Sequence, residues 1–434
     1  MDQDNVDKLV DHLFRHEAGK MVSVLTRTFG AENLALVEDV VQDTLLQAVQ
    51  VWPVKGIPDN PSAWFHRAAR NKAIDVLRRN SHSVRISPDG EEESLPDTGP
   101  PVQDLLDDDW QEDSIKDDML RMMFVCCHPG IPEEGQVTLI LKTLCGFSTS
   151  EIARAFLTSE DTISKRLYRT KEFFRQNKIP FVVPPHEDLK SRTEAVLNSI
   201  YLLFNEGYSS TDSEKLIRED LMSEAMLLCK MLTEDPNTQR PETFALMALM
   251  CFHSSRNESR LTPAGEIILL PLQDRSKWNQ DLIVLGNEYM DKAAFGESVS
   301  KYHLEAAIAF EHCAAKTYET TNWKRILELY EWLCRISPSP VTELNRVVAV
   351  MRVHGPHEAL KAVESISGKK RIENYCLYHS LIGQIYLRLN RATEAKAEFE
   401  AAIKLTKSTT EKKLLERKIA ELTLTSDESS ARSY

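Results

Sequence analysis

The chain has 434 residues and a formal net charge of −13, with 42% hydrophobic and 27% charged residues. A chain of this length is expected to form several domains, and the balance is that of a globular protein, not of a disordered or fibrous one. Its longest apolar runs fall far short of the roughly 18 residues that cross a bilayer, and residues 1–20 hold no apolar core of a secretory signal. We therefore expect a cytoplasmic protein without a membrane contact.

The eight cysteines are scattered, and only Cys126 and Cys127 lie close together in the sequence. Adjacent cysteines followed by His128 could ligate a metal, but vicinal side chains rarely chelate one ion and no second pair lies nearby. We expect buried free thiols and neither a metal nor a cofactor. The sequence shows no nucleophile–base pairing and no phosphate-binding loop, so we do not expect an enzyme.

Positive charge is concentrated in two blocks, although the chain as a whole is acidic. Residues 60–85 carry six Lys or Arg against one acid, and residues 164–178 again carry six against one. Residues 86–118, which lie between these blocks, hold thirteen acids and one lysine. The total charge argues against a protein that coats nucleic acid everywhere, since such binding comes from neutralising phosphates. The distribution predicts two basic modules that flank an acidic segment.

The first basic module is predicted to be helical. Apolar residues recur at helical spacing at Val37, Val40 and Val41. Prolines and a glycine then interrupt the pattern, and a new helix is expected to begin at Pro61, with Asn60 as its N-cap.

The second basic module contains a pattern typical of a helix-turn-helix between Ser148 and Arg175. Ser148 or Thr149 can cap a short helix, residues 156–157 form the turn, and Ser159 can cap the second helix. Apolar side chains at Ile163 and Leu167 then face the core. The outer face suits base edges and phosphates in a major groove, and it consists of Asp161, Thr162, Lys165, Arg166 and Arg169. An ordinary helical pair with a solvated basic face fits the same pattern.

The rest of the chain is predicted to be helical and to contain a faint repeat. The clearest unit runs from Cys376 to Thr409 and matches the spacing of a tetratricopeptide repeat. Its small and large positions are Ile382, Gly383, Tyr386, Ala395, Phe399 and Ala402. The fold class is therefore all-α. The expected divisions are a first module at 1–80, an acidic flexible linker at 81–112, a second module at 113–180, a helical-repeat extension at 186–425 and a disordered tail at 426–434.

The segments VEDVVQDTLLQAVQVWP and NPSAWFHRAARNKAIDVLRRN resemble region 2 of the extracytoplasmic-function (ECF) sigma factors of bacterial RNA polymerase. The segment LKTLCGFSTSEIARAFLTSEDTISKRLYRTK resembles their region 4, and the two regions stand in the order and separation of that family. The resemblance implies that the recognition helix, including Ser159, binds the promoter −35 element. It also implies that the helix carrying Asp39, Gln42, Asp43 and Leu46 docks on the clamp helices of the largest polymerase subunit. A solvated acidic helix face is the alternative for the docking helix.

The resemblance further places the promoter −10 element on residues 60–79 and on the loop at 55–59. Holding an opened strand requires positive charge beside pockets for flipped bases. The candidate residues are Asn60, Trp64, Arg67, Arg70, Asn71, Lys72, Arg78 and Arg79. Trp64 could stack on a base, but an aromatic at the start of an amphipathic helix is more often part of the core. The acidic linker either imitates nucleic acid in the polymerase channel or is a solvated tether.

The C-terminal half resembles the ECF subgroup that carries a tetratricopeptide-like extension, through SIYLLFNEGYSS, RPETFALMALMCFHSSR, LQDRSKWN, YHLEAAIAFEH and PSPVTELNRVVAVM. A polar block in it is a candidate regulatory site for a ligand or for the surfaces of regions 2 and 4, and consists of Asn205, Glu206, Tyr208, Asp274, Arg275 and Trp278. Buried polar contacts between repeats explain these residues equally well. An anti-sigma protein or a small ligand is the expected partner of the C-terminal domain.

The leading hypothesis is a promoter-specificity subunit of RNA polymerase, whose partners are core polymerase and promoter DNA and whose extension controls activity. One alternative is a stand-alone helix-turn-helix regulator with a ligand-sensing repeat domain, which would need no polymerase-docking helix. A repeat scaffold with incidental basic patches is the third hypothesis, and it predicts no dependence on DNA.

Overall fold

A computed structural model of the chain describes residues 17–83, 112–156, 158–209, 217–296, 298–406 and 408–431. Within these ranges the regular elements are helices, and the only β-type pairing is an isolated antiparallel bridge between Leu261 and Ile267. The predicted all-α fold is confirmed. Over the same part of the chain, no helix combines the length and the apolar character needed to cross a membrane.

The chain divides into two compact units, residues 1–203 and residues 204–434. The division falls inside one helix, α8 (His186–Tyr208). The domain limits inferred from the sequence remain predictions, because the expected linker lies largely outside the described residues. Helix α3 extends to Ser83 and α4 begins at Glu112, so helical structure borders the expected linker on both sides.

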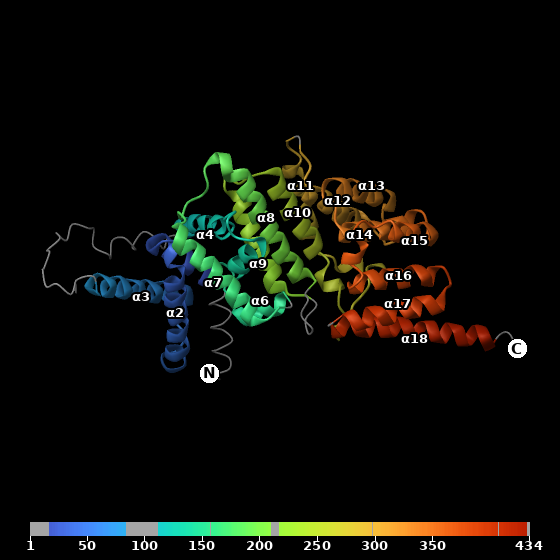
Figure 1. Ribbon diagram of the computed structural model, residues 1–434, viewed down its shortest axis with the longest axis horizontal. Coiled ribbons are helices and arrows are strands. Elements are labelled where there is room, and N and C mark those ends of the chain that lie inside the picture. The colour runs from blue at the N-terminus through green and yellow to red at the C-terminus, as the bar shows by residue number, and fades with distance from the viewer. Residues whose placement is uncertain are drawn as a thin grey trace. The chain divides into compact units, whose positions relative to one another are not determined.

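The described part of the first unit opens with helical residues 17–29. The elements that follow (Figure 1) are η1 (Ala31–Asn33), α2 (Leu34–Lys55), α3 (Pro61–Ser83), α4 (Glu112–Cys126), α5 (Glu133–Thr143), α6 (Thr149–Ala155), α7 (Glu160–Asn177) and the first part of α8.

Two local signals explain how the first module turns from α2 into α3. Helix α2 ends at Gly56, which has a φ of 85° that a residue with a Cβ rarely adopts. The Oδ1 atom of Asn60 then accepts a hydrogen bond from the backbone N–H of Ala63 at 3.0 Å. Asn60 therefore caps α3, as the sequence predicts, and Pro61 occupies the first helical position. The caps fix where the basic helix starts relative to α2.

The second unit is a succession of helices, each packed against the next from α12 to α18. It comprises the end of α8, then α9 (Glu219–Glu234), α10 (Pro241–Ser254), η3 (Asn257–Ser259), η4 (Leu270–Leu272), η5 (Arg275–Lys277), α11 (Gln280–Ala293), α12 (Lys301–Ala314), α13 (Trp323–Ile336), α14 (Pro340–Val353), α15 (Pro356–Glu364), η6 (Lys369–Arg371), α16 (Cys376–Arg388), α17 (Ala392–Leu405) and α18 (Thr409–Ala431). Helices α16, α17 and α18 lie side by side (Figure 1).

Close helix approach is built into the repeat-like pair α16 and α17. A Cβ added to Gly383 would lie only 2.6 Å from the Cε1 atom of Phe399, which is fully buried. Ala395 and Ala402 are also fully buried on the same helix as Phe399. The small and large positions predicted from the sequence therefore face each other, and Gly383 is required because no larger residue fits against the ring.

Helix α18 runs to Ala431 and so extends into the stretch that the sequence predicts to be a disordered tail. The physical reason is that extending an existing helix costs little, since each added residue gains one backbone hydrogen bond. The last three residues, 432–434, lie outside the described residues.

Candidate nucleic-acid interface

The outward face of α2 carries the four residues expected to dock on the polymerase. Asp39, Gln42, Asp43 and Leu46 follow the i, i+3, i+4, i+7 spacing of one helix face, and all four are exposed. Leu46 exposes 56% of its surface, an unusual fraction for a leucine with acidic neighbours. The face is therefore acidic with one exposed apolar residue at its C-terminal end, and its composition suits a partly hydrophobic, basic partner surface.

Helix α3 presents part of its positive charge to solvent. Arg67, Asn71 and Arg78 are exposed, whereas Arg70 and Lys72 are partly buried. Lys72 lies 3.7 Å from the carboxylate of Asp43 on α2, which joins a predicted DNA-binding residue to a predicted polymerase-binding residue. The side chain of Arg79 lies outside the described ones. The surface that α3 offers to an anion is centred on Arg67 and Arg78.

Trp64 is half-buried in a cluster of three aromatic rings. Its ring centroid lies 5.4 Å from that of Trp52 and 5.7 Å from that of Phe65, both in edge-on geometry. Trp52 and Phe65 are buried, whereas part of Trp64 remains accessible. Trp64 thus contributes to the core through one side and leaves another side at the surface beside the start of α3.

A buried acid fastens α3 to the helix at residues 17–29. The Oε2 atom of Glu17 lies 2.8 Å from Nε2 of His66, and Lys20 donates to Oε1 at 3.0 Å. Burial alone would raise the pKa of Glu17, but the hydrogen bonds from His66 and Lys20 outweigh it and lower the pKa to about 2. The carboxylate therefore stays charged and holds the basic helix in place at neutral pH.

The helix pair α6 and α7 is set by side-chain caps that the sequence predicts. Ser148 and Glu151 exchange hydrogen bonds at the start of α6, each accepting from the backbone N–H of the other. Ser159 accepts from the backbone N–H of Thr162 at 3.2 Å and so begins α7. Ser148, and not Thr149, is thus the capping residue of the first helix. The two helices are joined by residues 156–159.

The face of α7 opposite its core residues carries the candidate recognition side chains. Ile163 is fully buried and Leu167 exposes 7% of its surface, so the opposite side of the helix faces solvent. The outward residues are Ser159, Asp161, Lys165 and Arg169, which are exposed, and Thr162 and Arg166, which are partly exposed. Lys165 is paired with Asp161 at 2.6 Å, but both side chains are mostly exposed, so exchanging this partner for a phosphate costs little.

The two modules contact each other through an ion pair between α7 and α2. Lys171 donates to the Oε2 atom of Glu38 at 2.6 Å, and only 9% of the Glu38 side chain is exposed. Glu38 is the neighbour of Asp39, the first residue of the predicted docking face. Helix α7 is therefore fastened to the helix that carries that face.

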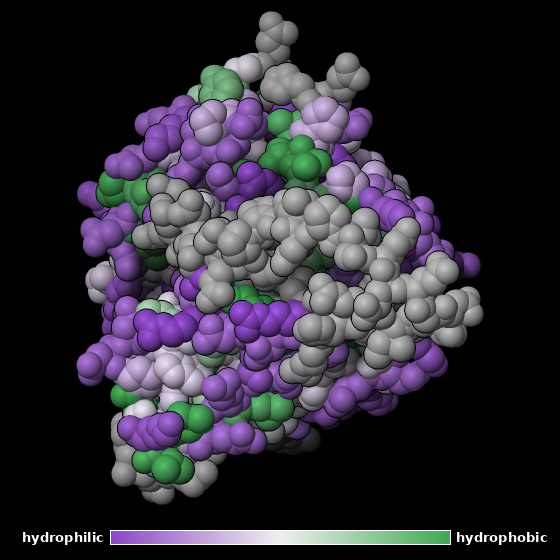
Figure 2. All heavy atoms as spheres, turned by 90° about the vertical axis from the view of Figure 1, so that its left-hand side faces the viewer, coloured by the Kyte–Doolittle hydropathy of each residue, from purple (hydrophilic) through white to green (hydrophobic). Residues whose placement is uncertain are grey.

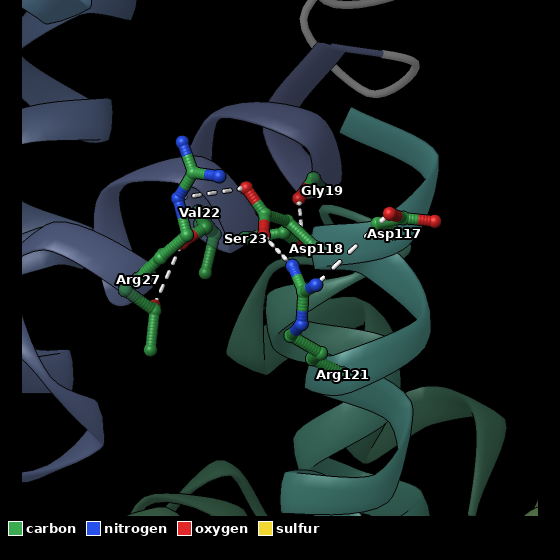
Figure 3. Close-up of polar contacts among 8 residues, drawn as sticks. Gly19, Val22, Ser23, Arg27, Asp117, Asp118 and Arg121 are labelled. Atoms are coloured by element: carbon green, nitrogen blue, oxygen red, sulfur yellow. Dashed lines mark hydrogen bonds and ion pairs between the residues drawn. The ribbon is translucent and has the colours of Figure 1, made fainter. Parts of the chain in front are cut away.

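A second inter-module contact centres on Asp118 of α4, which is completely buried (Figure 3). Arg121 donates to its Oδ1 atom at 2.6 Å, and Nε of Arg27 lies 3.4 Å from Oδ2. Burial raises the pKa of the Asp118 carboxyl, and the two guanidinium groups oppose that rise without cancelling it. Arg27 belongs to the first module, so this buried carboxylate links the modules.

The helix at residues 17–29 approaches the second module so closely that only glycine fits. A Cβ added to Gly19 would lie 2.1 Å from the carbonyl oxygen of Leu144, at the end of α5. The obstacle is backbone and cannot rotate away. Gly19 therefore marks a direct backbone contact between the two modules.

The space-filling view from the side on which Figure 1 shows α2 and α3 is mostly hydrophilic among the described atoms (Figure 2). Hydrophobic atoms appear there in small separate patches. This face suits polar and charged partners better than a broad apolar interface.

The adjacent thiols of Cys126 and Cys127 are buried beside hydroxyl groups. Cys126 pairs with Thr143 at 3.4 Å, and Cys127 pairs with Ser199 at 3.6 Å. Burial raises the pKa of Cys127 to about 12. Over the described residues, no group of three or more His, Cys, Asp or Glu side chains is arranged to hold a metal.

The predicted polar block of the second unit is partly assembled. Arg256 lies over both the Tyr208 and Trp278 rings, at 5.9 and 5.8 Å, and Arg275 lies over Trp278 at 4.8 Å. Asp274 instead caps the short helix η5 through Ser276 and is exposed. Asn205 and Glu206 are partly buried on α8. Tyr208, Arg275 and Trp278 therefore lie in one group. Arg256 connects them by packing on both Tyr208 and Trp278, and it was not among the residues predicted from the sequence.

Sequence reasoning also missed the residues that join the modules. The pairs Lys171 with Glu38 and Arg27 with Asp118 connect positions far apart in the chain and leave no periodic trace. The only local hint is the i, i+3 spacing of Asp118 and Arg121 within α4.

Comparison with known proteins identifies the first module. Residues 13–83 match the model of sigma-70 region 2, and residues 192–294 match a family of unknown function. The first match identifies this module as a sigma-70 region 2 domain, which supports a role in transcription initiation with core RNA polymerase and promoter DNA.

An uncharacterized protein of Rhizobium meliloti is 36% identical to the chain over 396 residues, which cover 90% of this chain and 92% of the relative. The chain belongs to the same family as this relative, and its residues 13–83 carry a sigma-70 region 2 domain. No solved structure matches the chain.

Proposed function

We propose that the chain is an ECF sigma factor in which α3 opens and binds the −10 element, α6 and α7 form a helix-turn-helix that binds the −35 element, and the second unit is a tetratricopeptide-like regulatory extension. The observation that carries the proposal is the outward face of α7. A capped helix with a buried apolar side presents polar and cationic residues on its other side, in the same unit as a sigma-70 region 2 domain.

Run-off transcription with core polymerase tests the promoter-binding part. Replacing both Arg166 and Arg169 by Gln should lower the yield by about 5-fold or more, since loss of even one base-contacting arginine costs about 1–3 kcal/mol. Arg175→Gln is the matched control, because this arginine lies on the same helix but pairs with Glu172. Equal yields from the double variant and the control would contradict a recognition role for this face.

Binding to core polymerase separates the proposal from the stand-alone regulator. Asp43→Ala combined with Leu46→Ala should weaken binding of the chain to core polymerase, because both side chains are exposed on the predicted docking face. Lys190→Ala, at an exposed position of α8 in the first unit and away from this face, is the control. A wild-type chain that fails to bind core polymerase but binds operator DNA would favour the regulator.

The packing between the modules supports a closed resting form. The −10 and −35 elements are separated by about 25 base pairs, or roughly 85 Å at about 3.4 Å per base pair. In the structure α7 contacts α2 directly through Lys171 and Glu38. We therefore infer that the contacts between the modules break before both promoter elements are bound, and that core polymerase supplies the open form.

Truncation of the second unit tests whether it regulates transcription. The contacts of α8 decide at which residue the chain should be truncated. Arg192 of α8 donates to the backbone carbonyl of Phe124, and Ser199 of α8 pairs with Cys127. A chain that ends before His186 would lose these contacts of the first unit. A chain that ends after Tyr208 keeps them, and transcription that is unchanged in level and control would contradict a regulatory role.

A further inference from the structure

We propose that the second unit contains a binding site for a small organic anion with an apolar body, in a cavity formed by α13, α14, α16 and α18. The site is separate from both predicted promoter surfaces, which belong to the first unit. It borders the predicted polar block, because Arg275 of that block donates to the backbone carbonyl of His312 in the lining. It does not depend on the sigma-factor function, since it is argued from the second unit alone.

The cavity has the size and lining of a ligand site. Its volume is about 600 Å³, within the range of about 300–1,000 Å³ typical of small-molecule pockets. One wall is the segment Leu269–Leu272, which includes η4, and apolar residues of α14 and α16 form much of the rest, among them Leu344, Val348 and Leu381.

The Lys and Arg side chains that line the cavity give it positive charge only. Arg352, Arg388 and Lys418 line it, and its lining includes no aspartate or glutamate. The acid Glu319, which acts to raise the pKa of Arg352, is exposed and lies outside the lining. Burial lowers the pKa of Arg352, and the charge of Arg388 also acts to lower it, because the two cations repel each other. An anion between them would relieve that repulsion.

Two lining groups contain polar atoms that nothing in the protein satisfies. The Nδ1 atom of His312 and the Nε atom of Arg352 are buried and have no hydrogen-bond partner. Buried polar atoms in folded proteins are nearly always paired, so a bound ligand or an ordered water is expected as the partner of both atoms. A ligand head group with acceptor oxygens supplies one for Arg352, and His312 can pair through either tautomer.

Two aromatic side chains pack against Arg352 at the charged side of the cavity. Arg352 lies 4.6 Å from the Tyr318 ring centroid and 5.6 Å from that of Trp323, and both rings line the cavity. These rings hold the guanidinium group in one orientation and shield it from water. Lys418 donates to Gln384 at 3.2 Å, and burial lowers the pKa of its ammonium group. The cations are thus positioned in advance around an apolar space, which is the arrangement that an amphipathic anion requires.

Calorimetric titration of the full chain with eight-carbon probes below their micelle concentrations tests the proposal. Octanoate and octyl phosphate should bind at one saturable site, and the stronger of the two identifies the head group as carboxylate or phosphate. Octan-1-ol and octyltrimethylammonium, which share the apolar body, should bind at least tenfold more weakly. Similar binding of all four probes would overturn the proposal, because it would show a site without charge selection.

Substitutions locate the binding. Arg352→Gln and Arg388→Gln should each weaken octanoate binding about tenfold or more, and Val348→Trp should block it by filling the cavity. Arg335→Gln, on the exposed side of α13, is the matched control and should bind as the wild type does. Unchanged binding by both cavity arginine variants would overturn the proposal, as would binding of an acidic hexapeptide but of neither alkyl anion. Circular dichroism of each variant separates lost binding from lost folding.

Discussion

The contact between α7 and α2 yields a prediction that tests the effect of burial on an ion pair. Lys171–Glu38 and Lys165–Asp161 both join a lysine of α7 to a carboxylate at 2.6 Å. The side chains of the first pair are 26% and 9% exposed, and those of the second are 64% and 70% exposed. The distance and the type of charge are therefore matched, and the pairs differ in burial and in whether they join two helices or lie within one.

The expected coupling energies follow from this difference. Two unit charges at this distance attract by about 1.6 kcal/mol in a water-like medium and by about 6 kcal/mol at an effective dielectric of about 20, before desolvation is subtracted. We expect a net coupling of about 2 kcal/mol for Lys171–Glu38. For Lys165–Asp161 we expect at most about 0.5 kcal/mol, as is typical of exposed helix pairs.

Double-mutant cycles measure these couplings. The variants are Lys171→Met, Glu38→Gln and their double, with Lys165→Met, Asp161→Asn and their double as the control cycle. Hydrogen exchange of peptides from α2 and α7 in the intact chain reports the free energy of opening. The control coupling should vanish at high salt, whereas the Lys171–Glu38 coupling should persist. A Lys171–Glu38 coupling no larger than the control would refute the reasoning that burial makes this contact matter.

Three further predictions concern single residues. Glu17 has a pKa lowered from 4.5 to about 2, so its contribution of about 3 kcal/mol is present above pH 4.5 and is lost as pH falls through 4.5 to about 2. In urea unfolding, Glu17→Gln should therefore cost about 3 kcal/mol at pH 7 and about half of that at pH 3, and a cost independent of pH would contradict this. Gly19→Ala should speed hydrogen exchange around Leu144, because the added methyl group meets backbone, and unchanged exchange would show that the modules do not pack there. Gly383→Ala should destabilise α16 and α17 by about 1–3 kcal/mol through its clash with Phe399, and a thermal unfolding midpoint equal to that of the wild type would disprove the clash.

Features that depend on nearby residues could be predicted from the sequence. The caps Asn60 and Ser159 act on backbone groups three residues away, so the residue types that make them are adjacent in the chain. The repeat positions Gly383 and Phe399 were also found, since small and large residues recur at helical spacing within one hairpin. The all-α class and the outward face of α7 follow from the same local periodicity.

The contacts that fix the modules could not be predicted. Asp118 looks like one more acid in an acidic stretch, yet it is completely buried between Arg27 and Arg121. Periodicity places a residue on a helix face but does not show which other helix covers that face. For the same reason, Lys72 was expected only at DNA, although it also lies beside Asp43 of α2.

The direct packing of the two modules has a consequence for how the protein behaves when it is abundant. If the contacts at Gly19, Glu38 and Asp118 together favour the closed form by about 3 kcal/mol, less than about 1% of free chains are open. The apparent affinity for a complete promoter is then about 150-fold weaker than that of the open form. Unbound copies would leave promoters unoccupied even at high concentration, so the number of chains engaged on DNA would follow the supply of polymerase and not the amount of this protein.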